Sequence, residues 1–155
     1  MLPLAIRPAV EADRAGILSL ADRLAAFGPS TRSPAEIAER ERGALADALA
    51  RPAAGSALLV AEHEELGLAG ILLLESRRDY FTGEAHGHVA ILAVAREAEG
   101  RGVGRALLAA AEEWGRAEGY RRLTLSVFSD NLRPRDLYAR QGWRPELETW
   151  YKPLA

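Results

Sequence analysis

The chain has 155 residues, 48% of them hydrophobic, a formal net charge of −2 and no cysteine. This length supports one domain with a sizeable core, and the lack of cysteine excludes disulfides, thiolate metal ligands and a cysteine nucleophile. The weak negative charge gives no general attraction to nucleic acid, and we find neither a signal-peptide core nor an apolar run of ~18 residues. We therefore expect one domain over residues 1–155, cytoplasmic, with no nucleic-acid partner, no membrane partner and no metal.

The first half of the chain predicts a strand, two helices and a hairpin. Residues 4–8 form the opening strand, and apolar residues at helical spacing over 11–27 predict a helix that ends at Gly28-Pro29. A second helix starts with Ser33 as N-cap, Pro34 in the first turn and Glu36 at the capping-box position. Residues 57–61 and 68–74 then predict two antiparallel strands.

The second half predicts strands that alternate with helices. A polar loop over 77–83 precedes a strand over 88–94, a glycine-rich turn and a helix over 102–118. That helix has an apolar face comprising Val103, Leu107, Ala111 and Trp114. The remaining predicted elements are a strand over 123–127, a short helix over 133–140 and a closing strand over 143–152. This order indicates a mixed α/β sheet in one unit.

The glycine-rich turn between the strand and the helix predicts an anion site. The first turn of a helix leaves main-chain N–H groups without partners, and the helix dipole adds positive charge there. Gly100, Gly102 and Gly104 would let a phosphate approach this main chain closely, and Arg101 and Arg105 flank it.

The spacing of these glycines excludes two common phosphate loops. The nucleoside-triphosphate loop needs a lysine, and the segment has none. The dinucleotide fingerprint G-x-G-x-x-G fails because its last glycine would fall at Arg105 or Leu107. Taken alone, the cluster is equally consistent with a tight turn and a helix cap.

The six residues from Glu99 to Gly104, Glu-Gly-Arg-Gly-Val-Gly, resemble the acetyl-CoA motif of the GCN5-related N-acetyltransferases (GNAT), Arg/Gln-x-x-Gly-x-Gly/Ala. Glu99 stands where arginine or glutamine is usual. Because these positions mainly offer main-chain amides, we expect the anion site to persist, with weaker affinity from a carboxylate near the pyrophosphate. Val94 matches the apolar residue that ends the fourth strand of the family.

A second segment resembles the same family. Asn131 and Tyr138, followed by Gly142 and Trp143, match the pattern N-x-x-A-x-x-L-Y … G-F, with Pro134 in place of alanine and Trp143 in place of phenylalanine. Proline is tolerated in the first turn of a helix. Alone, this segment would be a helix cap and a core tyrosine. With the glycine turn, it favours the family.

The resemblance implies a mostly antiparallel sheet flanked by helices and an enzyme that moves an acetyl group from acetyl-CoA to a primary amine by direct attack in a ternary complex. Tyr138 would protonate the leaving thiolate, and a main-chain amide would stabilise the oxyanion. The implied cofactor-binding residues are Leu92, Ala93, Val94, Glu99, Gly100, Arg101, Gly102, Val103, Gly104, Arg105, Asn131, Arg135 and Tyr138.

The catalytic base is less well defined by the sequence. His88 lies eleven positions before Glu99, where some family members carry a catalytic glutamate. Histidine titrates near neutral pH, so His88 is the predicted base. Glu75, Glu84 and water remain alternatives, and so does a role for His88 as a polar strand residue without catalytic function.

The sequence leaves the acceptor open, because a fold does not name its substrate. It is a small-molecule or peptide amine in this interpretation. The resemblance is also compatible with a homodimer through the terminal strands. The alternative function is a non-catalytic acetyl-CoA sensor or regulatory module, and a nucleotide-binding protein with an unusual glycine turn is a remote third.

Overall fold

The computed structural model describes residues 3–26, 29 and 31–155. Its sheet has five strands in the order β1-β2-β3-β4-β5, and β5 runs parallel to β4 while the other neighbours are antiparallel. The strands are β1 (Leu4–Pro8), β2 (Ala57–His63), β3 (Gly67–Arg78), β4 (Ala85–Val94) and β5 (Leu123–Leu125). The predicted mixed, mostly antiparallel α/β fold is confirmed.

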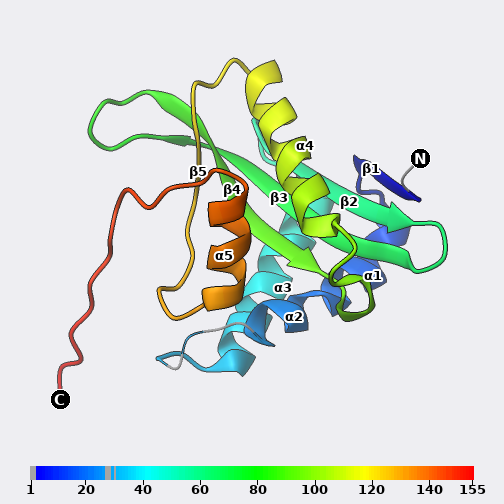
Figure 1. Cartoon of the computed structure of the whole chain (residues 1–155), viewed down its shortest axis with the longest axis horizontal. Helices are drawn as coiled ribbons and strands as arrows, with labels where there is room; N and C mark the ends of the chain where they lie inside the picture. The colour runs from blue at the N-terminus through cyan, green and yellow to red at the C-terminus, as the bar shows by residue number, and fades with distance from the viewer. Residues whose placement is uncertain (1–2, 27–28, 30) are drawn as a thin grey trace.

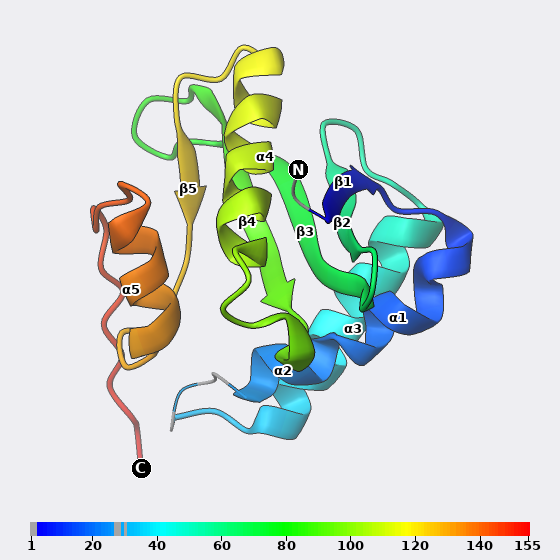
Figure 2. The ribbon, with the colours of Figure 1, turned by 45° about the vertical axis from the view of Figure 1, so that its right-hand side comes forward.

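The helices cover both faces of the sheet. Figures 1 and 2 show α4 (Val103–Ala117) on one face and α1 (Arg14–Ser19), α2 (Ala21–Ala26) and α3 (Pro34–Ala50) on the other. Helix α5 (Leu132–Arg140) lies outside β5, beyond the edge of the sheet. None of the helices in the described part is long and apolar enough to cross a membrane.

The core follows from the apolar patterns of the sequence. β3 is almost continuously apolar over 68–74 because it is the middle strand and is covered on both faces. Val103, Leu107 and Ala111 of α4 are buried, as predicted. From the opposite face, α1 contributes Ile17 and α3 contributes Leu45, and both side chains are fully buried.

The helix starts follow the local sequence. The Ser33 hydroxyl accepts a hydrogen bond from the Glu36 N–H at 3.4 Å, and Pro34 occupies the first position of α3. Pro134 falls in the first turn of α5, after Asn131 at the N-cap. Both predicted helix starts are confirmed.

Several predicted elements have different bounds. β2 ends at His63, β4 begins at Ala85 and β5 ends at Leu125, where the sequence predicts 61, 88 and 127. Residues 11–26 form a short 3-10 helix η1 (Glu11–Asp13) followed by α1 and α2. The two helices are separated at Leu20, whose N–H donates a hydrogen bond to the Ile17 carbonyl at 3.1 Å. The predicted end of this helix at 27–28 lies outside the described residues. β3 continues to Arg78, so the loop predicted over 77–83 is shorter and is closed by a hydrogen bond from the Asp79 N–H to the Glu84 carbonyl.

The prediction of a closing strand over 143–152 is wrong. These residues form no helix or strand and lie largely exposed. A strand needs a neighbour to satisfy its main-chain N–H and C=O groups. Within the described part of the chain, no strand pairs with this segment.

β4 and β5 are paired only near one end of β4, so the two strands separate towards the other end. Their register runs from Gly87–Leu123 to Val89–Leu125, after which β4 continues to Val94 without β5 beside it. At the junction, Gly87 has no room for a Cβ atom, because Leu123 Cδ2 would lie 2.5 Å away. A residue without a side chain therefore allows β5 and α4 to close on β4 at one end while the strands separate at the other.

Candidate active site

A cavity of about 550 Å³ follows the divergence of β4 and β5. Its walls come from β4, the turn before α4, the start of α4, the segment after β5 and α5, with α2 and α3 on the remaining side. Most of the predicted site residues line it: Leu92, Ala93, Val94, Glu99, Gly100, Gly102, Val103, Gly104, Arg105, Asn131 and Tyr138.

One end of the cavity is the N-terminus of α4. Gly102 is the N-cap and has φ +80°, a left-handed conformation that favours glycine. The first helical hydrogen bond runs from the Ala106 N–H to the Gly102 carbonyl at 3.0 Å. The N–H groups of residues 103–105 precede it and have no acceptor within the helix. This end can bind an anion.

Glu99 lies beside this end and joins two helices. One carboxylate oxygen accepts from the Arg23 guanidinium of α2, and the other is 2.9 Å from Nη2 of Arg133 in α5. The Glu99 side chain is 26% exposed and lines the cavity, as do both arginines. The carboxylate thus holds two cationic groups at the anion-binding end and partly compensates their charge. Arg23 and Arg133 were not predicted, because their spacing in sequence carries no motif.

The wall between the two ends is the edge of β4 that β5 leaves uncovered. Residues 90–94 line the cavity beyond the last β4–β5 pair. Alternate main-chain groups of a strand point to opposite edges, so some of these N–H and C=O groups face the cavity rather than β3. They can bind an amide or stabilise an oxyanion.

Tyr138 of α5 lies on the opposite wall. Burial raises the pKa of its phenol above the ordinary value of 10, so the hydroxyl stays protonated at neutral pH. The centroids of the Tyr138 and Trp143 rings lie 6.4 Å apart, so the tyrosine ring is close to the tryptophan that follows α5. A protonated hydroxyl in a cavity suits a proton donor.

His88, the predicted base, lies outside the cavity wall. Its side chain is only 5% exposed and is not part of the cavity wall, although the next residue, Val89, is. Nδ1 of His88 is 2.7 Å from Oγ1 of Thr124, which is also 3.1 Å from Nε2 of His86. Burial, followed by the charge of Arg77, lowers the pKa of His88 to about 4. The imidazole is therefore neutral and weakly basic near pH 7.

Four other predicted residues also lie outside the cavity wall. Arg101 is exposed, and Arg135 donates from Nη1 to the Ser129 carbonyl at 2.6 Å. Among the alternative bases, the Glu75 carboxylate is ion-paired with the Arg77 guanidinium at 3.0 Å. Glu84, in the loop between β3 and β4, has its carboxylate 4.0 Å from the guanidinium of Arg121. Local hydrogen bonding and ion pairing hold Arg135, Glu75 and Glu84 away from the cavity.

Glu41 of α3 is a cavity residue that sequence reasoning missed. It lines the cavity together with Leu24 of α2 and Ile37 of α3. Burial, and then the negative charge of Glu75, raises the pKa of Glu41. No motif marks this residue, because its position depends on how α3 packs across the sheet.

The family model for the acetyltransferase (GNAT) family matches residues 20–143, which include the whole cavity-forming region from α2 to Trp143. The chain belongs to this family. The resemblance found in the glycine turn and in the Asn131–Tyr138 segment is therefore confirmed, and the family supports acetyl transfer as the general activity.

Solved structures show the same fold. The GCN5-related N-acetyltransferase from Ralstonia eutropha JMP134 is 22% identical, with a TM-score of 0.75 and coverage of 97% of this chain and 98% of that one. A Trypanosoma brucei acetyltransferase is 26% identical, with a TM-score of 0.68 over 97% and 99%. The aminoglycoside 6'-N-acetyltransferase from Acinetobacter haemolyticus is 18% identical, with a TM-score of 0.69 over 97% and 98%. No curated protein gives a significant match.

Proposed function

We propose that this GNAT chain is an N-acetyltransferase that takes the acetyl group from acetyl-CoA and transfers it to a primary amine by direct attack in a ternary complex. One observation carries the proposal: a single cavity connects the N-terminus of α4, the uncovered edge of β4 and the Tyr138 phenol. A pyrophosphate requires an anion site, a pantetheine arm requires an edge that binds amides, and the sulfur that leaves the thioester requires a proton donor.

In this proposal, the pyrophosphate accepts hydrogen bonds from the main-chain N–H groups of residues 103–105. Arg105 and Arg133 line the cavity at this end and add charge-assisted contacts. The amides of the pantetheine arm then pair with the β4 edge over 90–94, as a short strand would. This orientation brings the thioester to Tyr138.

The reaction needs a nucleophile, an oxyanion site and a proton for the leaving group. The neutral amine attacks the thioester carbonyl carbon, and a β4 N–H near Leu92 to Val94 stabilises the oxygen as it gains charge. When the C–S bond breaks, the electron pair goes to sulfur and Tyr138 supplies the proton. Because a thiol has a pKa near ~8.5, a phenol with a raised pKa donates only when held next to the sulfur. The products are the N-acetylated amine and CoA.

We assign the surplus amine proton to Glu41 or to water that Glu41 orients. A carboxylate whose pKa is raised is a better proton acceptor than an ordinary one. His88 is the weaker candidate because its low pKa and its hydrogen bond to Thr124 leave it a poor base outside the cavity wall. A carboxylate on the acceptor side also attracts a protonated amine into the cavity.

A titration tests the binding part of this proposal. Isothermal titration with acetyl-CoA should show one site per chain, and ATP or NAD should bind much more weakly. A Cβ atom at Gly104 would lie 3.0 Å from Leu137 Cδ2 in the cavity wall, so Gly104→Leu should weaken acetyl-CoA binding at least tenfold. Gly43→Leu is the control, because nothing lies within 4 Å of that position in α3. Absence of acetyl-CoA binding would overturn the proposal.

An assay of thiol release separates an enzyme from an acetyl-CoA sensor. Wild-type protein is mixed with acetyl-CoA and a panel of small-molecule and peptide amines, and free CoA is measured. We expect Glu41→Gln to lower kcat/KM by roughly 10²-fold, the lower range for a general base, and Glu39→Gln, an exposed neighbour on α3, to have no effect. Tight acetyl-CoA binding with no thiol release from any amine would favour the sensor.

A further inference from the structure

The active-site cavity carries opposite charges at two separated places. Arg23 of α2 donates from Nε to the Val94 carbonyl at 3.3 Å, beside the turn that leads to α4. Glu41 of α3 lies close to Glu75, whose negative charge acts on it, and Glu75 pairs with His88 in the register of β3 and β4. Six residues of β4 separate His88 from Val94, a distance of about 20 Å along a strand. This register places Glu41 towards the end of the cavity away from the anion-binding turn.

The charge of Glu41 has no counter-ion in the cavity wall. The other acidic residue of the wall, Glu99, is ion-paired with two arginines. Within the described part of the chain, Glu41 takes part in no hydrogen bond or ion pair. Its neighbour Glu75 is neutralised by Arg77 at 3.0 Å, and neither of these two residues lines the cavity. A half-buried carboxylate without a partner favours the binding of a cation, and one such charge matches one ammonium group.

The side chains that share this part of the wall are mostly apolar. Ile37 lies one helical turn before Glu41 on the same face of α3, and Leu24 lines the cavity from α2, which packs against α3. Val89 and Leu125, the last pair between β4 and β5, line it as well. A further charged or polar group of a bound molecule would lose its water here and find few hydrogen-bond partners.

We infer that the acceptor is a small primary monoamine with an apolar body, an alkylamine or an arylalkylamine. Its ammonium group would lie against Glu41 and its body against Leu24 and Ile37. This inference rests on the proposed acetyl transfer and names its acceptor. Once Glu41 has taken the ammonium proton, the neutral nitrogen bonds to the thioester carbonyl carbon, the C–S bond breaks, and the sulfur keeps the electron pair and receives a proton from Tyr138. The N-acetylated product is uncharged, so Glu41 no longer holds it and it can leave.

The charges of the wall disfavour an acceptor that carries a carboxylate. The arginines among the described residues of the wall come from α2, from α5 and from the first turn of α4, and none of them comes from α3 or β4. Arg32, just before α3, has its guanidinium carbon 5.5 Å from the centroid of the Phe128 ring and lies outside the wall. The carboxylate of an amino acid would therefore meet Glu41 without a cation to compensate it, and like charges at close range repel.

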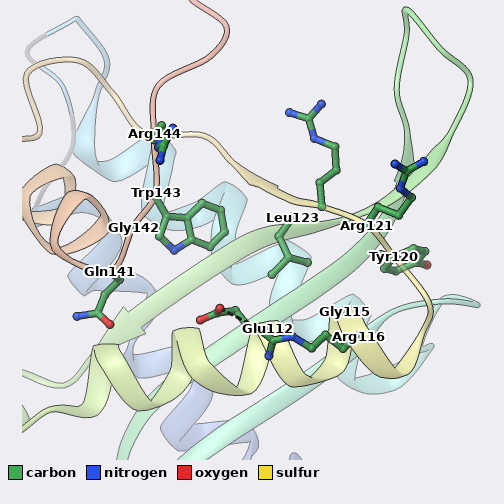
Figure 3. Close-up of a pocket in the computed structure, with 11 residues that line it drawn as sticks. Glu112, Gly115, Arg116, Tyr120, Arg121, Leu123, Gln141, Gly142, Trp143 and Arg144 are labelled. Carbon is green, nitrogen blue, oxygen red and sulfur yellow. Dashed lines mark hydrogen bonds and ion pairs between the residues drawn. The ribbon is translucent and has the colours of Figure 1, made fainter.

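A second hollow of the molecule does not suit a cationic acceptor. It lies between α4, β5 and residues 141–144 (Figure 3) and has a volume of about 400 Å³. Its one acidic residue among those described, Glu112, is 3.4 Å from Arg116 and is thereby compensated. The arginines that line it are Arg116, Arg121, Arg122 and Arg144. An ammonium group is repelled there, so the amine is expected in the cavity that Glu41 lines.

Calorimetric titrations of the protein saturated with CoA measure acceptor binding without turnover. Phenethylamine is compared with phenylalanine, which adds a carboxylate, and hexylamine with hexamethylenediamine, which adds a second ammonium group. We expect the monoamine of each pair to bind about tenfold or more tightly, because the added charge is desolvated without a partner. Equal or weaker binding of the monoamines, or no binding of any of the four, would overturn the inference. The expected order of binding with no thiol release from any amine would support the acceptor class and refute the acetyl transfer.

A change of specificity separates recognition from folding. Ile37→Glu places a second carboxylate one helical turn from Glu41 and should turn the preference towards hexamethylenediamine by roughly tenfold or more, with the circular dichroism unchanged. Glu41→Gln should weaken the binding of both monoamines by roughly tenfold, and Glu39→Gln, exposed on α3, is its control. A folded Ile37→Glu variant that keeps the wild-type preference would refute the inference. Should that variant not fold, unchanged monoamine binding by Glu41→Gln would refute it instead.

Discussion

Substitution of Gly87 by alanine tests the packing that opens the active-site cavity. A Cβ atom there would lie 2.5 Å from Leu123 Cδ2, 2.7 Å from Trp114 Cζ3 and 3.2 Å from Tyr120 Cδ2. Side chains from β5, α4 and the loop between them would all have to move. Overpacking of a core costs about 1–3 kcal/mol, and three crowded neighbours place Gly87→Ala near the upper end. For a chain of this size, about 3 kcal/mol lowers the Tm by roughly 6–12 °C.

The matched control is Gly43→Ala, in the middle of α3, where no atom lies within 4 Å. Alanine is favoured over glycine inside a helix by roughly 0.5–1 kcal/mol, so this variant should raise the Tm by about 1–4 °C. Differential scanning calorimetry of the two variants and the wild type measures both shifts. An unchanged Tm for Gly87→Ala would refute the argument that β5 closes on β4 at this glycine.

Three further predictions concern Tyr138, His88 and Glu99. Tyr138→Phe should lower kcat by about 10²-fold or more without changing the Kd for acetyl-CoA; with wild-type protein, the loss of activity at alkaline pH should lie above pH 10, because burial raises the pKa of the phenol. Because the pKa of His88 in the folded protein is about 4, the imidazole is protonated between pH 6.5 and about 4 only in the unfolded state. The free energy of unfolding should therefore fall by up to about 3 kcal/mol across that range, and urea titrations of His88→Gln should lack this loss. Glu99→Gln removes a carboxylate from the anion-binding end and should tighten acetyl-CoA binding by roughly 3- to 10-fold in calorimetric titrations, while the exposed Glu97→Gln should leave it unchanged.

The correct predictions depend on neighbours in sequence. The start of α3 follows from Ser33 and Pro34, and the buried face of α4 follows from the helical spacing of Val103, Leu107 and Ala111. Hydrogen bonds in caps and amphipathic periodicity act over one or two turns, so a single sequence contains the whole signal.

The incorrect or missing predictions depend on residues far apart. The break at Leu20 and the place of Glu41 in the cavity wall depend on how α1, α2 and α3 pack against the sheet. Glu99 is ion-paired with Arg23 and Arg133, which are 76 and 34 residues away along the chain. In the sequence, Glu99 is recognisable only as an unusual residue of the glycine motif. For His88, which stays a prediction as the base, only the folded chain shows the burial beside Thr124 that lowers the pKa of its imidazole to about 4.

Short-range signals in the sequence predict most of the elements in their order, the glycine-rich turn before α4 and the family, because each depends on periodicity, capping or spacing along the chain. Only the folded chain shows that β4 and β5 separate after Val89, that Glu41 lines the cavity and that residues 143–152 pair with no strand in the described part of the chain. Desolvation and strand pairing cause these outcomes, and both depend on segments that meet only when the chain folds.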